Sequence, residues 1–197
     1  MQWLNEPAQW SEQAGVLVVT ADAGTDFWRI TGYGFIRDNG HLYGELLDGD
    51  FDLSMRVRGS YAAQYDQAGA MVRLDELRWL KTGIEYVDGR PRFSTVITAG
   101  HSSWAVADLP ADPGELGLLV TRRGEAIEVR YRLDGAPSTL AALAYLPPGE
   151  QVLAGAMCAA PEGSGFQVTF HDLTIADLAI GRPEAAGNRD GADRDFS

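Results

Sequence analysis

The sequence has only one cysteine, Cys158, so no disulfide can form within the chain. Basic residues are also scarce: 16 lysines and arginines against 28 aspartates and glutamates give a formal net charge of −12. Both nucleic acids and anionic membranes are negatively charged, so this balance argues against either as a partner. Cys158 lies in an apolar segment, which predicts a buried, unreactive thiol.

Targeting and membrane-spanning segments are missing from the pattern as well. The first residues lack the basic and apolar regions of a signal peptide. No apolar run approaches the roughly 20 residues that a transmembrane helix needs. With a single cysteine, these absences lead us to expect a cytoplasmic protein in a reducing compartment.

Motifs for metals, cofactors and glycoside hydrolysis are absent too. The three histidines, His41, His101 and His171, are far apart and lack metal-ligand spacing. No Glu-x-Asp-x-Glu run offers paired carboxylates on one strand, and no phosphate-binding loop is complete. We therefore expect no cofactor and no metal, although Asp22 and Asp26 could bind calcium in a loop.

Glycine, by contrast, is abundant, with 23 residues. It recurs in pairs that suit tight hairpin turns: Asn39-Gly40, Asp48-Gly49, Asp88-Gly89 and Asp134-Gly135. Between the turns, apolar and polar residues alternate with a period of two, which is typical of strands with one buried face. This alternation is clear in 51–58, 127–133 and 166–170. Further strands are expected at 16–20, 28–36, 66–74, 79–87, 92–99, 103–107, 116–122 and 151–157.

Many short strands without a long amphipathic helix predict an all-β, antiparallel two-sheet sandwich or barrel. The segment 138–146 is either helical or an edge strand. A phase shift after Phe170 predicts a β-bulge near His171 and Asp172. The alternation stops at Ile180, so we expect one domain over 1–180 and a flexible C-terminal tail over 181–197.

Several longer runs resemble a known family. They are Thr25-Asp26-Phe27-Trp28-Arg29, Tyr33 to His41, Tyr65 to Gly69 with Arg73-Leu74-Asp75, Trp79 to Gly89, and Pro161 to Phe166. Together they resemble the domain-of-unknown-function family that includes the fungal regulation-of-enolase protein, over about residues 3–176. The resemblance implies a concanavalin A-like lectin/glucanase jelly roll, and a regulatory association, but no defined activity. This chain has Ser102-Ser103-Trp104 where family members tend to carry Ser-Asp-Trp.

One face of the segments 66–74 and 79–87 is unusually polar. Alternation places Ala68, Ala70, Val72 and Leu74 on one side of the first strand, and Gln67, Gly69, Met71 and Arg73 on the other. On the second strand it separates Leu80, Thr82, Ile84 and Tyr86 from Trp79, Lys81, Gly83 and Glu85. The polar side could form an open binding surface on a concave sheet, joined by Ser94 and Thr98, or it could carry only cross-strand ion pairs.

Aromatic residues near this face could add flat walls that suit a sugar ring, although for Trp28 and Trp104 individually core packing is favoured over ligand stacking. The predicted ligand-binding residues are Gln67, Arg73, Lys81, Glu85, Trp28, Tyr65, Trp104 and His41. Three functions fit them. The first is non-catalytic binding of a carbohydrate or small polar metabolite. The second is a protein-binding regulator of metabolism, and the third is a carbohydrate-active hydrolase that uses Glu85 with Asp66 or Asp26.

Overall fold

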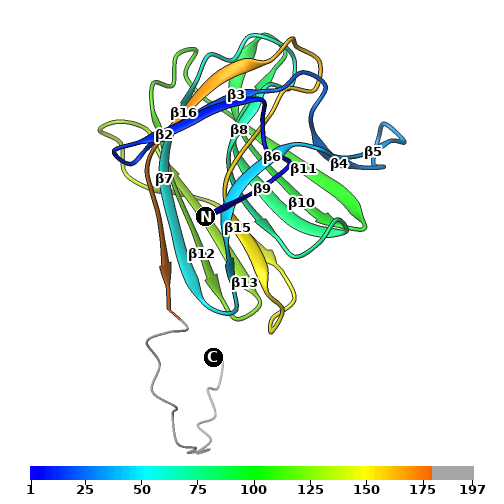
Figure 1. The fold of residues 1–197 in the computed structure, drawn as a ribbon, viewed down its shortest axis with the longest axis vertical. Helices are drawn as coiled ribbons and strands as arrows, with labels where there is room; N and C mark the ends of the chain where they lie inside the picture. Colours follow the sequence, from blue (N-terminus) through cyan, green and yellow to red (C-terminus); the bar gives the residue numbers. More distant parts are fainter. Residues whose placement is uncertain (179–197) are drawn as a thin grey trace, which may run out of the picture.

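The structure is a computed structural model that describes residues 1–178, and the regular structure in that range is all β-strand (Figure 1). The strands are β1 (Gln2–Leu4), β2 (Gln9–Gln13), β3 (Val16–Ala21), β4 (Phe27–Arg29), β5 (Ile36–Asp38), β6 (His41–Leu47), β7 (Phe51–Gly59), β8 (Gln67–Arg73), β9 (Arg78–Val87), β10 (Arg90–Ala99), β11 (His101–Asp108), β12 (Leu116–Arg123), β13 (Ala126–Arg132), β14 (Thr139–Tyr145), β15 (Val152–Ala159) and β16 (Phe166–Asp177). In this part of the chain there is no helix long and apolar enough to cross a membrane. The expected tail, 181–197, lies outside the described residues.

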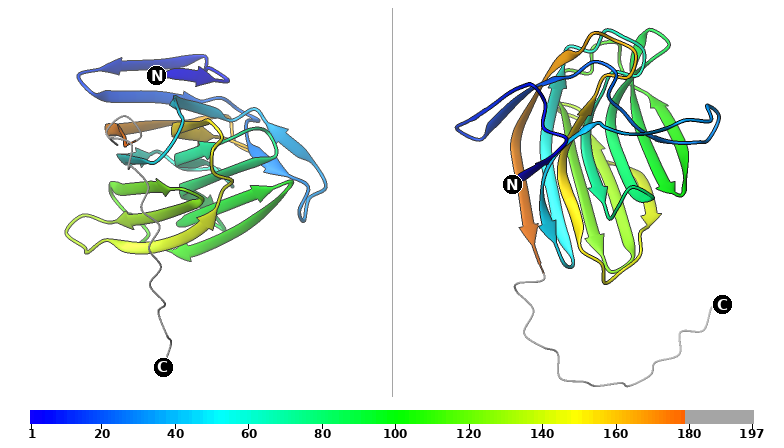
Figure 2. Two further views of the ribbon diagram at one scale, coloured as in Figure 1. Left: turned by 90° about the horizontal axis from the view of Figure 1, so that it is seen from below. Right: turned by 45° about the vertical axis from the view of Figure 1, so that its right-hand side comes forward.

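Two seven-stranded antiparallel sheets pack face to face (Figure 2). We call β1-β6-β15-β8-β9-β10-β11 the pocket sheet and β14-β13-β12-β7-β16-β3-β2 the back sheet. Their inner faces meet in one apolar core, to which β7 contributes Phe51, Leu53, Met55 and Val57 at alternate positions. The pocket sheet contributes Ala68, Ala70, Val72, Leu80 and Ile84 to the same core. The expected all-β, two-sheet sandwich is therefore confirmed.

Most expected strands are present with shifts of one or two residues at their ends. The segment 138–146 is resolved as the edge strand β14, which pairs with β13. The β-bulge is also confirmed, because the register between β16 and β7 shifts between His171 and Thr174. Asp172 there has a φ of 51°. Cys158 is buried as expected, and burial raises the pKa of its thiol.

The strand expected over 28–36 is wrong. The chain instead forms a short hairpin, in which β4 pairs with β5 and residues 30–35 make the turn. Ile30 takes a φ of 65° and donates its N–H to the Phe35 carbonyl, while Gly32 and Gly34 also have positive φ. Such conformations end a strand, because the β region of backbone conformation requires a negative φ. The strands β1, β2 and β6 were not anticipated.

The hairpin β4–β5 lies against the outer face of the pocket sheet, beside β9 to β11 (Figure 1). The Arg29 N–H donates to the Ser102 hydroxyl at 2.9 Å, and the Arg29 side chain donates to the Gly100 carbonyl at 3.2 Å. Underneath is a second, smaller apolar cluster of Phe27, Trp28, Leu42, Met71, Trp79, Val96, Leu153 and Met157. Part of the outer face is therefore core, and the part beside the hairpin carries the pocket described below.

Candidate functional site

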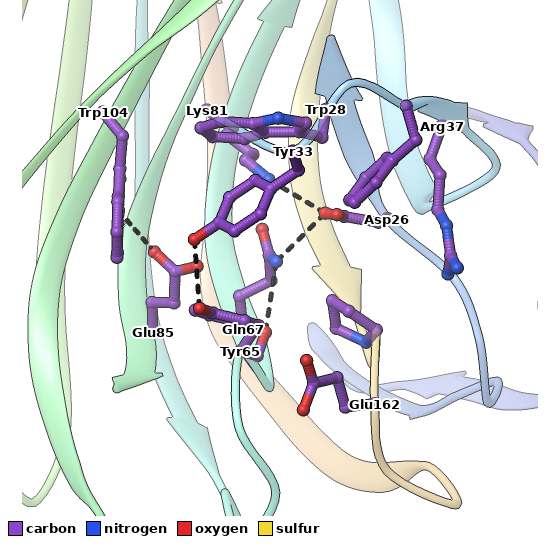
Figure 3. Close-up of a pocket in the computed structure, with 12 residues that line it drawn as sticks. Asp26, Trp28, Tyr33, Arg37, Tyr65, Gln67, Lys81, Glu85, Trp104 and Glu162 are labelled. Carbon is purple, nitrogen blue, oxygen red and sulfur yellow. Dashed lines mark hydrogen bonds and ion pairs between the residues drawn. The ribbon is translucent and has the colours of Figure 1, made fainter. Parts of the chain in front are cut away.

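A pocket of about 160 Å³ opens where the hairpin, the pocket sheet and the loop after β15 meet (Figure 3). Gln67, Lys81 and Glu85 reach it from β8 and β9. The remaining lining residues are Asp26, Trp28, Tyr33, Phe35, Arg37, Tyr65, Trp104, Pro161 and Glu162. Charged, amide and aromatic groups thus converge on a space large enough for one small molecule.

Paired glycines shape the floor of the pocket. Gly69 on β8 faces Gly83 on β9, between the Gln67–Glu85 pair and the Met71–Lys81 pair. A Cβ atom at Gly83 would lie 2.2 Å from the Ala68 carbonyl oxygen, and one at Gly69 would lie 2.0 Å from the Thr82 carbonyl oxygen. Only glycine permits this close approach of two backbones. The two glycines thus let β8 and β9 lie close together between the residues that reach the pocket, Gln67, Lys81 and Glu85.

Lys81 and Asp26 form a buried ion pair at the back of the pocket. The Lys81 ammonium donates to Asp26 Oδ1 at 3.2 Å and to the Phe27 carbonyl at 2.7 Å. Lys81 is only 3% exposed. Asp26 Oδ1 also accepts the Phe27 N–H at 2.8 Å and the Gln67 amide at 3.3 Å. The pair therefore fixes the start of β4 onto the sheet.

Glu85 is a second buried carboxylate, 6% exposed. Its Oε2 accepts the Ser94 hydroxyl at 2.6 Å and the Trp104 indole N–H at 2.9 Å. Burial raises the pKa of Glu85, whereas Lys81, Ser94 and Trp104 act in the opposite direction without cancelling that effect. Oε1 receives no hydrogen bond from the part of the chain that the structure describes, so it remains an acceptor for a ligand.

Four aromatic rings form an arc around the opening. Successive centroids are 5.5 Å apart for Trp28 and Tyr33, 6.4 Å for Tyr33 and Tyr65, and 6.2 Å for Tyr65 and Trp104. Every one of these pairs is set edge to face. The two tyrosine hydroxyls are 3.1 Å apart, and this contact with burial raises the pKa of Tyr33 to about 12. Figure 3 shows Trp28 and Trp104 edge-on, with Tyr33 between them.

The structure brings together six of the predicted binding residues: Gln67, Lys81, Glu85, Trp28, Tyr65 and Trp104. Trp28 both packs in the smaller core and lines the pocket. Ser94 contributes through its bond to Glu85. Thr98 instead lies within hydrogen-bond distance of Ser102, at 2.8 Å.

Arg73 and His41 lie outside the pocket, and each has a structural contact. Met71 and Trp79 lie between Arg73 and the pocket residues on β8 and β9. The Arg73 guanidinium instead donates to the Asp38 carboxylate of β5 at 2.6 Å. His41 accepts the Asp22 N–H on Nε2 at 3.0 Å, which leaves Nδ1–H to donate to the Asn5 carbonyl at 2.6 Å. Both side chains thus hold the hairpin and the N-terminal segment in place.

Of the two proposed partners of Glu85, only Asp26 lines the pocket. Asp66 is buried elsewhere, where its Oδ2 accepts the N–H groups of Ala62 and Ala63 at 3.0 and 2.9 Å. Among residues 1–178, neither Asp22 nor Asp26 belongs to a group of three or more His, Cys, Asp or Glu side chains that could hold a metal ion.

Sequence reasoning missed Tyr33, Phe35, Arg37, Pro161 and Glu162 as lining residues. The first three lie on the β4–β5 hairpin, where the alternation predicts a single strand over 28–36. The sequence signal for this turn is Gly32-Tyr33-Gly34, because glycine readily adopts the positive φ that tight turns require. Both glycines do have a positive φ in the structure. Pro161 and Glu162 follow β15, and nothing local indicates that this loop returns to β9.

Another hollow is larger, at about 420 Å³, and lies between β10–β11 and β14. Its lining side chains are apolar or small and polar, such as Ile97, Val106, Leu140 and Ser103, and none is charged. It therefore lacks the buried charged groups that the first pocket offers for orienting a polar ligand.

Glu85→Gln should stabilise the protein at neutral pH. Because the pKa of Glu85 is raised on folding, the folded state binds the extra proton between the ordinary pKa and the raised one. Stability therefore falls as pH rises through that window, and the ionised carboxylate lowers stability above it. We expect a higher thermal midpoint for Glu85→Gln than for wild type at pH 7.5, and a smaller difference at pH 4.

The matched control is Glu76→Gln, which changes an exposed carboxylate outside the pocket. It should leave the midpoint unchanged at both pH values. A Glu85→Gln protein that is destabilised equally at pH 4 and pH 7.5 would contradict the expectation, because the carboxylate would then serve packing alone.

Comparison with known proteins identifies a family and a solved structure with the same architecture. Residues 3–178 match the model of the family "Protein of unknown function (DUF1349)". Regulation of enolase protein 1 of Saccharomyces cerevisiae is 39% identical over 173 residues, or 88% of this chain and 87% of the yeast protein. A crystal structure of a functionally unknown protein from Saccharomyces cerevisiae superposes with a TM-score of 0.85 at 39% identity, covering 89% of this chain and 95% of that one.

The carbohydrate binding module CBM66 from Bacillus subtilis shares the fold only, with a TM-score of 0.56 at 13% identity over 88% of this chain and 94% of the module. The family match and the yeast relative each extend over most of the chain, and the two-sheet sandwich agrees with the fold of the module. The chain therefore belongs to the DUF1349 family of proteins of unknown function.

Proposed function

We propose that this protein binds a carbohydrate or similar small polar metabolite in the pocket without transforming it. The observation that carries the proposal is Glu85: Ser94 and Trp104 hold its Oε2, while Oε1 is left as an acceptor inside an aromatic arc. A polyol presents hydroxyl donors at its edge and C–H groups on its faces. It therefore matches oriented carboxylate and amide acceptors next to aromatic rings.

The size of the pocket supports one ring rather than a polymer chain. Its volume of about 160 Å³ is below the several hundred Å³ that larger ligands occupy. The hairpin also closes one side of the pocket, where Tyr33 and Phe35 would block the path of a long polysaccharide chain. The name of the yeast relative refers to regulation of enolase, and we extend the proposal to a regulatory role in sugar metabolism.

Hydrolysis is the weaker interpretation. It needs two carboxylates free to act as acid and base or nucleophile. Asp26 lines the pocket, but its Oδ1 already accepts bonds from Phe27, Gln67 and Lys81. A carboxylate oxygen with three donors anchors the hairpin and is not placed to attack a substrate.

The proposal is tested by a thermal-shift screen with neutral monosaccharides, polyols and sugar phosphates. A ligand at 100 times its dissociation constant stabilises the folded state by about 2.7 kcal/mol, which raises the midpoint of a chain of this size by roughly 5–10 °C. Trp104→Ala removes one ring wall and a donor to Glu85, and should weaken binding by about tenfold or more.

Trp10→Ala is the matched control, since Trp10 is 38% exposed and Trp104 36%, but Trp10 lies on β2 of the back sheet. It should leave the affinity unchanged. If no compound stabilises the wild-type protein, or if Trp10→Ala and Trp104→Ala lose affinity equally, this pocket is not the binding site.

A further inference from the structure

The charges in the pocket do not balance, and the imbalance lies at Glu85. Three carboxylates line the pocket, from Asp26, Glu85 and Glu162, against two cations, from Lys81 and Arg37. Asp26 is already paired with Lys81 at 3.2 Å. That pair is close to neutral overall, so Lys81 offers little attraction to a ligand anion and little repulsion to a ligand cation.

Arg37 does not neutralise Glu85 either. Its guanidinium donates to the Gly24 carbonyl at 3.1 Å and lies over the Phe35 ring, 5.3 Å from the centroid. Figure 3 shows Arg37 on the side of the pocket opposite Glu85. The donors that reach Glu85 are the Ser94 hydroxyl and the Trp104 indole, both neutral. Lys81 also lowers the pKa of Glu85 electrostatically, but Asp26 acts on it in the opposite sense, so the ion pair compensates the charge of Glu85 only in part.

Glu162 and the aromatic rings add to the negative potential. Glu85 and Glu162 both line the pocket, and both carboxylates raise the pKa of Tyr33 electrostatically. The faces of Trp28, Tyr33, Tyr65 and Trp104 carry the negative part of the ring quadrupole. Ring faces of this kind attract a cation lying within about 6 Å, and Trp attracts it most strongly.

We propose that the ligand of this pocket carries a protonated amine, placed between Glu85 Oε1 and the aromatic arc, on a small polar body such as an amino sugar. The inference rests on the proposed function and specifies the ligand class of the same site. The Glu85 carboxylate accepts the ammonium protons, the ring faces contact the charge, and the Gln67 amide is available to the remaining hydroxyls. An ammonium supplies the countercharge that Glu85 lacks in the described residues.

The test uses sugars that differ in one group. Binding of D-glucosamine, D-galactosamine and D-mannosamine is measured by titration calorimetry at pH 7 and low salt, each beside its neutral parent and its N-acetyl form. We expect at least one amino sugar to bind about tenfold more tightly than both neutral counterparts. That preference should shrink only modestly at 0.5 M salt, because salt screens the exposed Glu162 but has little effect on the buried Glu85.

Two variants locate the ammonium. Glu85→Gln should abolish the preference for the amine: the affinity for the amino sugar should fall about tenfold further than the affinity for the neutral parent, which also loses an acceptor for its hydroxyls. Glu162→Gln alters an exposed loop residue whose replacement does not disturb the core, and it should reduce the preference by about twofold to fivefold. Glu76→Gln, away from the pocket, should leave the preference unchanged.

The outcomes separate this inference from the proposed function. Neutral sugars that bind as tightly as their amino forms would overturn the inference and leave carbohydrate binding intact. A preference for amines that survives Glu85→Gln would also overturn it, since the ammonium would then lie elsewhere. No binding by any sugar of either kind would overturn both.

Discussion

Lys81→Met is expected to destabilise the protein by about 3–5 kcal/mol, the usual cost of removing one partner from a buried ion pair. The ammonium is the only charged donor to Asp26 Oδ1 among the described residues. Without it, Asp26 keeps the neutral donors from Phe27 and Gln67 but remains a buried anion. The Phe27 carbonyl also loses its 2.7 Å donor. Urea denaturation at pH 7, with an unchanged m-value, measures the loss.

The second variant of the pair provides the control. Adding Asp26→Asn to Lys81→Met removes the unpaired charge, so the double variant should be more stable than Lys81→Met alone. A Lys81→Met protein within about 1 kcal/mol of wild type would show that the pair contributes little. The hairpin would then be held by its apolar cluster and by the Arg73–Asp38 pair.

Gly83→Ala is expected to cost about 3–4 kcal/mol and to disrupt the pocket. Its Cβ would lie 2.2 Å from the Ala68 carbonyl oxygen and 2.7 Å from the Gly69 Cα, both backbone atoms that cannot rotate away. Relief requires β8 and β9 to separate, which adds strain to overpacking. Since Gln67 faces Glu85 across the same strand pair, ligand affinity should fall along with stability.

Gly89→Ala is the matched control. Gly89 has a φ of 79° in the β9–β10 turn, and no atom lies within 4 Å of its added Cβ. The change should therefore cost only about 1 kcal/mol of backbone strain and leave ligand affinity unchanged. Equal losses of stability for Gly83→Ala and Gly89→Ala would contradict the idea that backbone contact at Gly83 shapes the floor.

Much of the sheet structure could be predicted from local pattern. In β7 a strict alternation of apolar and polar residues reports the buried face directly. The same rule put Gln67, Lys81 and Glu85 on one side of β8 and β9, because strand side chains alternate whatever the rest of the fold does. The bulge in β16 was visible for the same reason, as a break in that period.

Local pattern was insufficient where distant segments decide the outcome. Residues 28–36 contain β-favouring aromatic and branched residues, yet the turn at Ile30 and Gly34 and the contact with Gly100 and Ser102 make a hairpin. The same limit applies to Arg73. It shares a strand face with Gln67, but Trp79 is its cross-strand partner and its guanidinium forms an ion pair with Asp38.

By itself, then, the sequence determined the all-β class, most strands and the polar face of β8 and β9, since these depend on periods of two and on turn residues. The tertiary structure decided which part of that face is open. The hairpin covers Met71 and Trp79, and Lys81 pairs with Asp26, 55 positions away in the chain. It also placed Tyr33 and Glu162 in the same pocket as Glu85. Contacts over such separations depend on how the whole chain packs, and no local periodicity encodes them.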